Sequence, residues 1–492
     1  MRGCALVCAG LGLIFAALLA GLVLFLGRVP KSYPLAKHPI PPVGGAVNLG
    51  GGLAGFGSPY LGHTGSWNGQ GGTLGGSSKI PDLEQERAMG LRWTFMPVYW
   101  RALEPDGPVN LGQDTPPSWR ELDAFVIAAK ERHLNVLMQA PVVGGNAGGP
   151  PKWAGRREPG KSAPGDMAGL AAFAGKLAER YRPGGTLARR EGWGTNYGVR
   201  AWELDNEPGS YRTHWQGQAA DYAEFATRTA ARIKSADPQA VIVVPGLAAG
   251  RHGLQWLEET LDAAAMAGSP VFHAQGKAYS IGPVTDVVSF HNYEGLDSAF
   301  SGKPRTVAQV FEDVRAVFEK WEHQSPGFNY ARKQEYWHTE GNFDFLGILS
   351  RPRRAAWRFQ FFTRAFAAGI RKVVVMDASA PEQTAVQAYV KTLPDPFPML
   401  EASNTITVVH GQVAVFRHPD APAPAGGQVW VIWALAGSGD ATVEIPVRRE
   451  RIGVVTVDGK FRTLSATAGR VRLDLSGDEK MAPPVLLVDR AR

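Results

Sequence analysis

Two glutamates in distant parts of the chain are the strongest candidates for chemistry. Glu207 lies between an asparagine and a proline in the segment Trp202–Pro208, and Glu340 follows the segment Tyr336–Thr339. Two carboxyl groups that face each other can cleave a glycosidic bond. One of them protonates the leaving oxygen, while the other, ionised, attacks or stabilises the anomeric carbon. The pair therefore predicts glycoside hydrolysis, provided that the fold brings the two residues together.

The elements that must position these residues alternate between strand and helix. The predicted strands are Ala46–Leu49, Leu91–Trp100, Asn135–Val143, Val199–Asn206, Ala240–Leu247, Val284–His291, Gln334–Thr339 and Arg371–Met376. The predicted helices between and after them are Trp119–His133, Met167–Tyr181, Ala219–Ser235, Leu254–Ala267, Val307–His323, Arg354–Ala368 and a short one near Glu382–Lys391. Such alternation calls for a parallel sheet with helices outside it, and eight units favour an α/β fold of the closed (β/α)8 TIM-barrel type over residues 46–398.

The C-terminal ends of the strands form one mouth in such a barrel. Glu207 follows the predicted fourth strand, Glu340 follows the seventh, and His291 and Tyr293 lie at the end of the sixth. We therefore expect the two carboxyl groups to face the mouth from nearly opposite sides. A separation of about 5–5.5 Å between them would give retention of configuration at the anomeric carbon.

The two strand ends resemble those of a known enzyme group. Asn206-Glu207-Pro208 and Thr339-Glu340 look like clan A glycoside hydrolases, and Trp202–Pro208 together with the C-terminal region is most similar to family 39. The resemblance implies that Glu207 is the acid/base and Glu340 the nucleophile. It also implies that Asn206 binds the sugar hydroxyl next to the anomeric carbon, and that His291 and Tyr293 line the sugar site and orient the nucleophile.

The chain departs from that pattern around the catalytic pair. Asp205 stands where the family usually has tryptophan, Gly341 where it has an aromatic residue, and Phe95 near the place of a common arginine. The predicted eighth strand runs into Met376–Ser379 instead of a tryptophan platform. Two interpretations of Asp205 are open: it binds a sugar hydroxyl, or it holds a neighbouring loop. The other acidic residue of the segment, Glu203, is interpreted as a buried structural partner.

Aromatic and basic side chains near the strand ends are further candidates for substrate contacts. Sugar rings stack on indoles, so four tryptophans at or beyond strand ends could be substrate platforms, with core packing as the alternative for each. They are Trp100, Trp153, Trp215 and Trp337. Arg351, Arg353 and Arg354 could contact an acidic polysaccharide, although a solvated helix start explains them more simply.

Both ends of the chain predict additional units. Residues 4–27 are uncharged and mostly apolar, long enough to span a membrane and without a good cleavage site, which favours an uncleaved anchor over residues 1–30. A proline-rich linker follows over residues 31–45. After about residue 399, short strands with Gly, Pro and Asp turns predict an antiparallel β-sandwich that ends at residue 492.

Composition excludes several other classes of protein. The 52 Lys and Arg against 45 Asp and Glu are too mild an excess for a nucleic-acid-binding surface. Both cysteines lie in the first ten residues, so the predicted globular part has no disulfide and no thiolate metal site. Gly50–Gly55 fits G-x-G-x-x-G, but the helix-breaking run Phe56–Pro59 follows, which favours a glycine-rich loop.

These observations predict a retaining glycoside hydrolase acting on a poly- or oligosaccharide. We expect it to need neither cofactor nor metal, to be anchored by its N-terminal helix, and to face the periplasm or the exterior. Two alternatives are open. One is a catalytically degenerate polysaccharide-binding subunit of an exopolysaccharide synthesis or export system, which the altered residues Phe95, Asp205 and Gly341 suggest. The other is a structural protein of the cell envelope.

Overall fold

The computed structural model describes residues 58–63, 83–112, 115–144, 149–208, 215, 217–247, 254–260, 272–274, 277–279, 286–294, 305–324, 335–342, 349–375, 379–393, 399–418 and 428–489. The predicted anchor, the linker and the predicted strand Ala46–Leu49 lie outside these residues. Within the described ranges, no helix is long and apolar enough to cross a membrane.

Eight parallel strands close into a barrel, with each strand paired to the next and the last paired to the first. They are β1 (Ser58–His63), β2 (Leu91–Tyr99), β3 (Asn135–Val142), β4 (Ala201–Glu203), β5 (Val241–Leu247), β8 (Val287–Tyr293), β9 (Glu335–Asn342) and β10 (Lys372–Val375). The predicted parallel α/β barrel is therefore confirmed. A hairpin of β6 (Phe272–Ala274) and β7 (Lys277–Tyr279) lies outside this sheet.

The first strand of the barrel differs from the predicted one. β1 pairs with β2 on one side and with β10 on the other, so it closes the barrel twelve residues after the expected start at residue 46. The segment contains Pro59 and Gly62, residue types that usually mark loops. Its strand conformation depends on backbone hydrogen bonds from two neighbouring strands, which the local sequence does not reveal.

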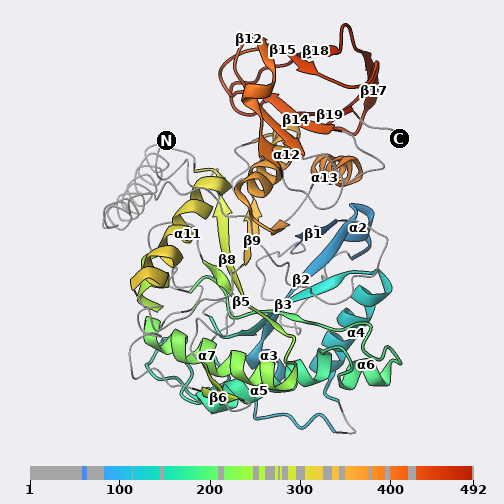
Figure 1. Cartoon of the computed structure of the whole chain (residues 1–492). Helices are drawn as coiled ribbons and strands as arrows, with labels where there is room; N and C mark the ends of the chain where they lie inside the picture. Colours follow the sequence, from blue (N-terminus) through green and yellow to red (C-terminus); the bar gives the residue numbers. More distant parts are fainter. Residues whose placement is uncertain are drawn as a thin grey trace, which may run out of the picture.

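The helices surround the barrel, as Figure 1 shows. They are α2 (Leu83–Ala88), α3 (Trp100–Leu103), α4 (Pro117–Glu131), α5 (Met167–Tyr181), α6 (Thr186–Arg190), α7 (Ala219–Ala236), α11 (Val307–Gln324), α12 (Arg351–Ala368) and α13 (Ala380–Thr392). Local signals set several ends. Gly369 ends α12 with φ 99°, a conformation that glycine adopts without strain, and Ser379 and Glu382 form a capping box at the start of α13.

The barrel is filled by its own side chains. Trp93, Phe95, Leu137, Val243 and Trp337 belong to one buried cluster contributed by several strands. A much larger core lies between the strands and the outer helices. The packed interior leaves the carboxyl ends of the strands as the place where polar side chains can gather.

The C-terminal region forms two antiparallel sheets. One has the order β11-β13-β14-β19-β16-β17 and the other β12-β15-β18. Their bounds are β11 (Leu400–Glu401), β12 (Thr407–His410), β13 (Val413–His418), β14 (Gln428–Ala434), β15 (Ala441–Pro446), β16 (Arg451–Thr456), β17 (Phe461–Ser465), β18 (Arg470–Leu475) and β19 (Val485–Asp489). Apolar side chains of both sheets form a second core, as in a β-sandwich.

The larger sheet also packs against α12 and α13, above the barrel in Figure 1. The Nε2 atom of Gln360 donates to the carbonyl oxygen of Ala482 over 2.7 Å, and the Arg364 guanidinium lies 5.4 Å from the Trp433 ring centroid. Two of the arginines at the start of α12, for which a solvated helix start was the favoured interpretation, form ion pairs: Arg353 binds Asp478, and Arg354 lies 3.4 Å from Glu382.

Candidate active site

The ends of β4, β8 and β9 bring Glu207, His291 and Glu340 together. One oxygen of each glutamate and one ring nitrogen of the histidine all lie within 4.8 Å of one another. The glutamate side chains are 13% and 18% exposed, whereas His291 is fully buried between them. Two carboxyl groups from segments 133 positions apart in the sequence therefore face one small, partly accessible space.

The turn after β4 directs Glu207 into that space. The regular strand stops at Glu203, because Asp205 and Glu207 have φ values of 66° and 36°, which no β-strand contains. Between them, Asn206 accepts a hydrogen bond on Oδ1 from Nε2 of Gln139 over 3.1 Å. Gln139 lies on β3 and was not predicted. An amide in the middle of a buried and otherwise apolar run was the available signal.

A register shift places Glu340. Phe290 of β8 pairs with His338 of β9, but the next residue, His291, pairs with Glu340, so Thr339 is the extra residue. Such an irregularity turns a side chain away from regular alternation. The Tyr293 hydroxyl donates a hydrogen bond to Oε1 of Glu340. The C-terminal ends of β8 and β9 are thus aligned so that Tyr293 of β8 can bind the Glu340 carboxylate of β9.

The charge state of His291 depends on its acidic neighbours. Its Nδ1 atom lies 2.8 Å from Oε1 of Glu207 and 3.9 Å from Oε2 of Glu340, and its Nε2 lies 4.0 Å from Oε1 of Glu203. Burial works to lower the pKa of His291, but Glu340, Glu207 and Glu203 outweigh it and raise that pKa to about 9. The imidazole is therefore positively charged at neutral pH.

A buried polar layer lies beneath the pair. Oε1 of Glu203 accepts hydrogen bonds from the hydroxyls of Ser289 over 3.2 Å and Thr339 over 3.0 Å. All three residues are fully buried. The layer joins β4, β8 and β9, the three strands whose ends carry the candidate site. The sequence-based interpretation of Glu203 as a buried structural partner agrees with these contacts.

The close packing around position 341 explains why glycine follows Glu340. A Cβ atom at Gly341 would lie 2.3 Å from Cε1 of His338 and 2.7 Å from the carbonyl oxygen of Asn292. His338 is fully buried, with burial and the nearby His291 lowering its pKa to about 3. Its ring occupies the space beside Gly341, so an aromatic residue at that position does not fit this chain.

Two predicted tryptophan platforms are wrong, because their rings are buried against neighbouring side chains. Trp100 is 0% exposed and packs edge-on against Trp153. Trp337 is 1% exposed inside the barrel, with Lys372 Nζ 4.7 Å from its ring centroid. Core packing was the alternative stated for both. A third candidate, Trp215, is also buried, and Trp153 is half-buried.

Asp205 does not lie where a sugar hydroxyl could reach it. The residue is 0% exposed, and its oxygens accept the backbone N–H groups of Asn206 over 2.7 Å and Val143 over 3.3 Å. The prediction that it binds substrate is therefore wrong, and its alternative, that it holds a neighbouring segment, agrees with the contacts. The sequence could not distinguish the two interpretations, because the local sequence does not reveal whether the Asp205 carboxylate points into the turn or outward.

Glu207, His291 and Glu340 offer the donor atoms that divalent metals bind, but their spacing differs from that of a metal site. Donors around a tetrahedral zinc ion lie roughly 3.4 Å apart, as bonds of about 2.0–2.1 Å require. Here the closest pair is 2.8 Å apart, a hydrogen-bond distance, and the set extends to 4.8 Å. Direct proton sharing between histidine and glutamate explains the arrangement.

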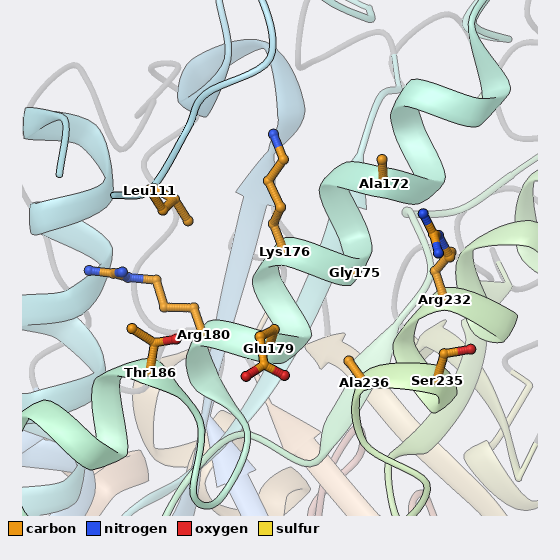
Figure 2. Close-up of a pocket in the computed structure, with 10 residues that line it drawn as sticks. All are labelled: Leu111, Ala172, Gly175, Lys176, Glu179, Arg180, Thr186, Arg232, Ser235 and Ala236. Atoms are coloured by element: carbon orange, nitrogen blue, oxygen red, sulfur yellow. The ribbon is translucent and has the colours of Figure 1, made fainter. Parts of the chain in front are cut away.

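A hollow of about 420 Å³ lies on the outer helix layer between α5, α6 and α7 (Figure 2). Lys176, Arg180 and Arg232 are its basic residues. Lys176 is paired with Glu104, and Arg180 binds Asp123 over 2.6 Å. Two of the three charges thus stabilise the helices, and the hollow is separate from the candidate active site.

No family model matches the sequence, and no curated protein matches it either. Solved structures match in fold. A GH39 β-xylosidase from Caulobacter crescentus is 15% identical with a TM-score of 0.55, covering 89% of this chain and 98% of that chain. A GH30 endoxylanase from Clostridium papyrosolvens is 11% identical with a TM-score of 0.52, covering 89% and 98%.

A family 51 α-L-arabinofuranosidase from Bifidobacterium longum is 12% identical with a TM-score of 0.53, covering 89% of this chain and 95% of that chain. This is the fold of clan A glycoside hydrolases. The match extends across the barrel and the C-terminal sandwich, as the resemblance of the two strand ends predicted. At these identities, the clan A likeness establishes the architecture, and the chemistry has to be argued from the site.

Proposed function

We propose that the protein is a retaining glycoside hydrolase that cleaves a poly- or oligosaccharide by double displacement. The observation that carries the proposal is the approach of Glu207 and Glu340 to within 4.8 Å between their nearest donor oxygens, both partly exposed. Retaining enzymes hold their carboxyl groups about 5–5.5 Å apart, whereas inverting enzymes leave about 6.5–9.5 Å for a water molecule.

The contacts around the two carboxyl groups support a different role for each. Glu340 is the nucleophile, because the Tyr293 hydroxyl binds Oε1 and thereby orients the carboxylate for attack by Oε2. Glu207 is the acid/base, and its partner His291 shares a proton with it over 2.8 Å. In the first step, Glu340 attacks the anomeric carbon while Glu207 passes the proton that it shares with His291 to the leaving oxygen.

The second step reverses these proton movements. Glu207, now ionised, removes a proton from water, which attacks the anomeric carbon and displaces Glu340. The proton that Glu207 takes from water restores the proton that it shares with His291. Asn206, held by Gln139, is proposed to bind the hydroxyl next to the anomeric carbon.

Labelling of the nucleophile provides the direct test. A 2-deoxy-2-fluoro glycoside with a good leaving group should attach covalently to Glu340, giving a mass increase that maps to the peptide containing it. Glu340→Gln should abolish labelling and turnover, and Glu207→Gln should lower turnover of unactivated glycans by about 10²–10⁴-fold. Glu479→Gln, at an exposed position on the sandwich, is the control and should behave as the wild type.

The sugar panel for this test follows the structural neighbours, whose names include a β-xylosidase, an endoxylanase and a bifunctional glucanase-xylanase. Xylosides and glucosides therefore come first. Binding of a glycan without cleavage, unchanged in both glutamate variants, would favour the non-catalytic polysaccharide-binding subunit instead. If the wild type neither binds nor cleaves any glycan tested, both the hydrolase function and the polysaccharide-binding function are contradicted.

We also propose that residues 1–30 anchor the protein with its barrel on the periplasmic or extracellular side, where secreted polysaccharides would be accessible. The uncharged stretch of residues 4–27 supports this proposal. Fractionation of cells that express the full chain tests it. The protein should sediment with membranes and resist extraction by alkaline carbonate, and protease added outside the inner membrane should digest the barrel. Recovery in the soluble fraction would contradict the anchor.

A further inference from the structure

Asp205 is a fully buried carboxylate in the turn that carries Glu207. Its Oδ1 accepts the backbone N–H of Asn206 over 2.7 Å, and its Oδ2 accepts the backbone N–H of Val143 over 3.3 Å. Val143 follows directly after β3, so this one side chain joins the end of β3 to the turn after β4. A second bond fixes the same turn, because the Tyr222 hydroxyl of α7 donates to the carbonyl oxygen of Leu204 over 2.7 Å.

The backbone of this turn is strained. Asp205 has φ 66° and Glu207 has φ 36°, and each non-glycine residue held at such values costs about 1–3 kcal/mol unless its surroundings compensate. Aspartate tolerates the left-handed region comparatively well because its side chain bonds to nearby backbone. Two backbone donors on one charged acceptor are among the stronger hydrogen bonds that a protein makes. The carboxylate of Asp205 thus compensates for the strain of the turn.

We propose that Asp205 is a positioning residue for the proton donor: its carboxylate holds the turn 205–207 so that Glu207 meets His291. The inference rests on the proposed hydrolase function. It explains why this chain carries aspartate at a position where the resembling family has tryptophan, since an indole has no acceptor for two backbone N–H groups. The residue acts through Glu207 and does not touch substrate.

A displaced proton donor has a specific kinetic effect. A glycoside with a poor leaving group needs protonation of the leaving oxygen, whereas one with an activated aryl leaving group departs without it. In Asp205→Asn, only one oxygen remains as acceptor for two N–H groups. We expect kcat/KM to fall roughly 10- to 100-fold on the alkyl glycoside and less than about 3-fold on the dinitrophenyl glycoside of the same sugar.

Two further variants separate positioning from stability. Asp205→Gly lacks the carboxylate but adopts positive φ without strain, so it keeps the fold and should show the same selective loss. Asp123→Asn removes a buried carboxylate that binds Arg180 in another part of the barrel, and should affect both substrates equally. An equal loss on both substrates in the two Asp205 variants, or no loss, would overturn the inference.

A second readout does not depend on turnover. The imidazole of His291 can be titrated by NMR in the histidine-labelled full chain, in the wild type and in Asp205→Gly. Withdrawal of Glu207 removes one of the charges that hold the His291 proton, so the midpoint should fall in the variant. An unchanged midpoint contradicts the positioning role. Wild-type protein that cleaves neither glycoside contradicts the proposed hydrolase function, while the titration still decides the role of Asp205.

Discussion

His291 and Glu207 share a hydrogen bond of 2.8 Å between Nδ1 and Oε1, although they are 84 positions apart in the chain. The imidazole is fully buried, and the carboxylates of Glu203, Glu207 and Glu340 all have an oxygen within 4.0 Å of one of its two nitrogens. One positive charge therefore balances a cluster of acidic groups drawn from two further strand ends. Its loss should affect both the stability of the barrel and the protonation of the catalytic pair.

The first prediction concerns stability and pH. The pKa of His291 is raised from 6.5 to about 9. Between pH 6.5 and pH 9, the folded state therefore holds a proton on His291 that the unfolded state has lost. The stabilisation is complete below pH 6.5 and is lost as the pH rises through about 9, with a total change of about 3 kcal/mol. Chemical unfolding at several pH values should show this decline in the wild type and a flatter profile in His291→Asn.

His338 provides the matched control for that experiment. It is a second fully buried histidine on the neighbouring strand, but its pKa is lowered to about 3, so it is neutral at every pH used. His338→Gln should change the stability by a constant amount and leave the slope between pH 6.5 and 9 as it is in the wild type. Parallel slopes for wild type and His291→Asn would contradict the charge assigned to His291.

The second prediction concerns Tyr293. Tyr293→Phe removes the hydroxyl that donates to Oε1 of Glu340 and should lower kcat by roughly 10- to 100-fold, since a hydrogen bond to a charged group contributes about 1.5–3 kcal/mol. Steady-state kinetics on the substrate found for the wild type measures this fall in kcat. Tyr197→Phe is the control. It removes a buried hydrogen bond from the Tyr197 hydroxyl to the carbonyl oxygen of Leu134, far from the site. The stability of this variant should fall, and its kcat should equal that of the wild type.

The third prediction concerns the helices that support the sandwich. Glu382 is 2% exposed and binds the fully buried Arg358 over 3.1 Å. Burial opposes the charge of Glu382, but Arg358 and Ser379 outweigh it and keep its pKa below the usual value. Glu382→Gln removes the charge that binds Arg358 over 3.1 Å and should cost about 3 kcal/mol of unfolding free energy, measured by denaturant titration.

A partly exposed ion pair at the same junction is the comparison. Arg353 is 36% exposed and binds Asp478 over 3.0 Å. Because solvent screens this pair, Arg353→Gln should cost less than about 1 kcal/mol. Equal costs for the two substitutions would show that burial does not set the strength of these contacts.

Residues whose roles depend on local pattern were predictable from the sequence. Strands β2, β3, β5 and β8 were found because apolar runs in a barrel are buried on both faces. Glu207 and Glu340 stood out because each is a carboxylic acid at the end of a predicted strand, and strand ends in a parallel barrel share one rim. Gln139 was missed, although it is a polar residue in the mostly apolar strand β3.

Contacts between distant segments decided everything else. Trp100 and Asp205 follow strand ends, as a platform or a sugar ligand would, and Trp337 lies within β9, yet all three are buried. The sequence by itself determined most of the succession of strands and helices and the two acidic strand ends, since hydrophobic periodicity is a local property. Only the tertiary structure decided which polar groups face the mouth, because a side chain's direction at a strand end depends on turn dihedrals and register that neighbouring strands impose.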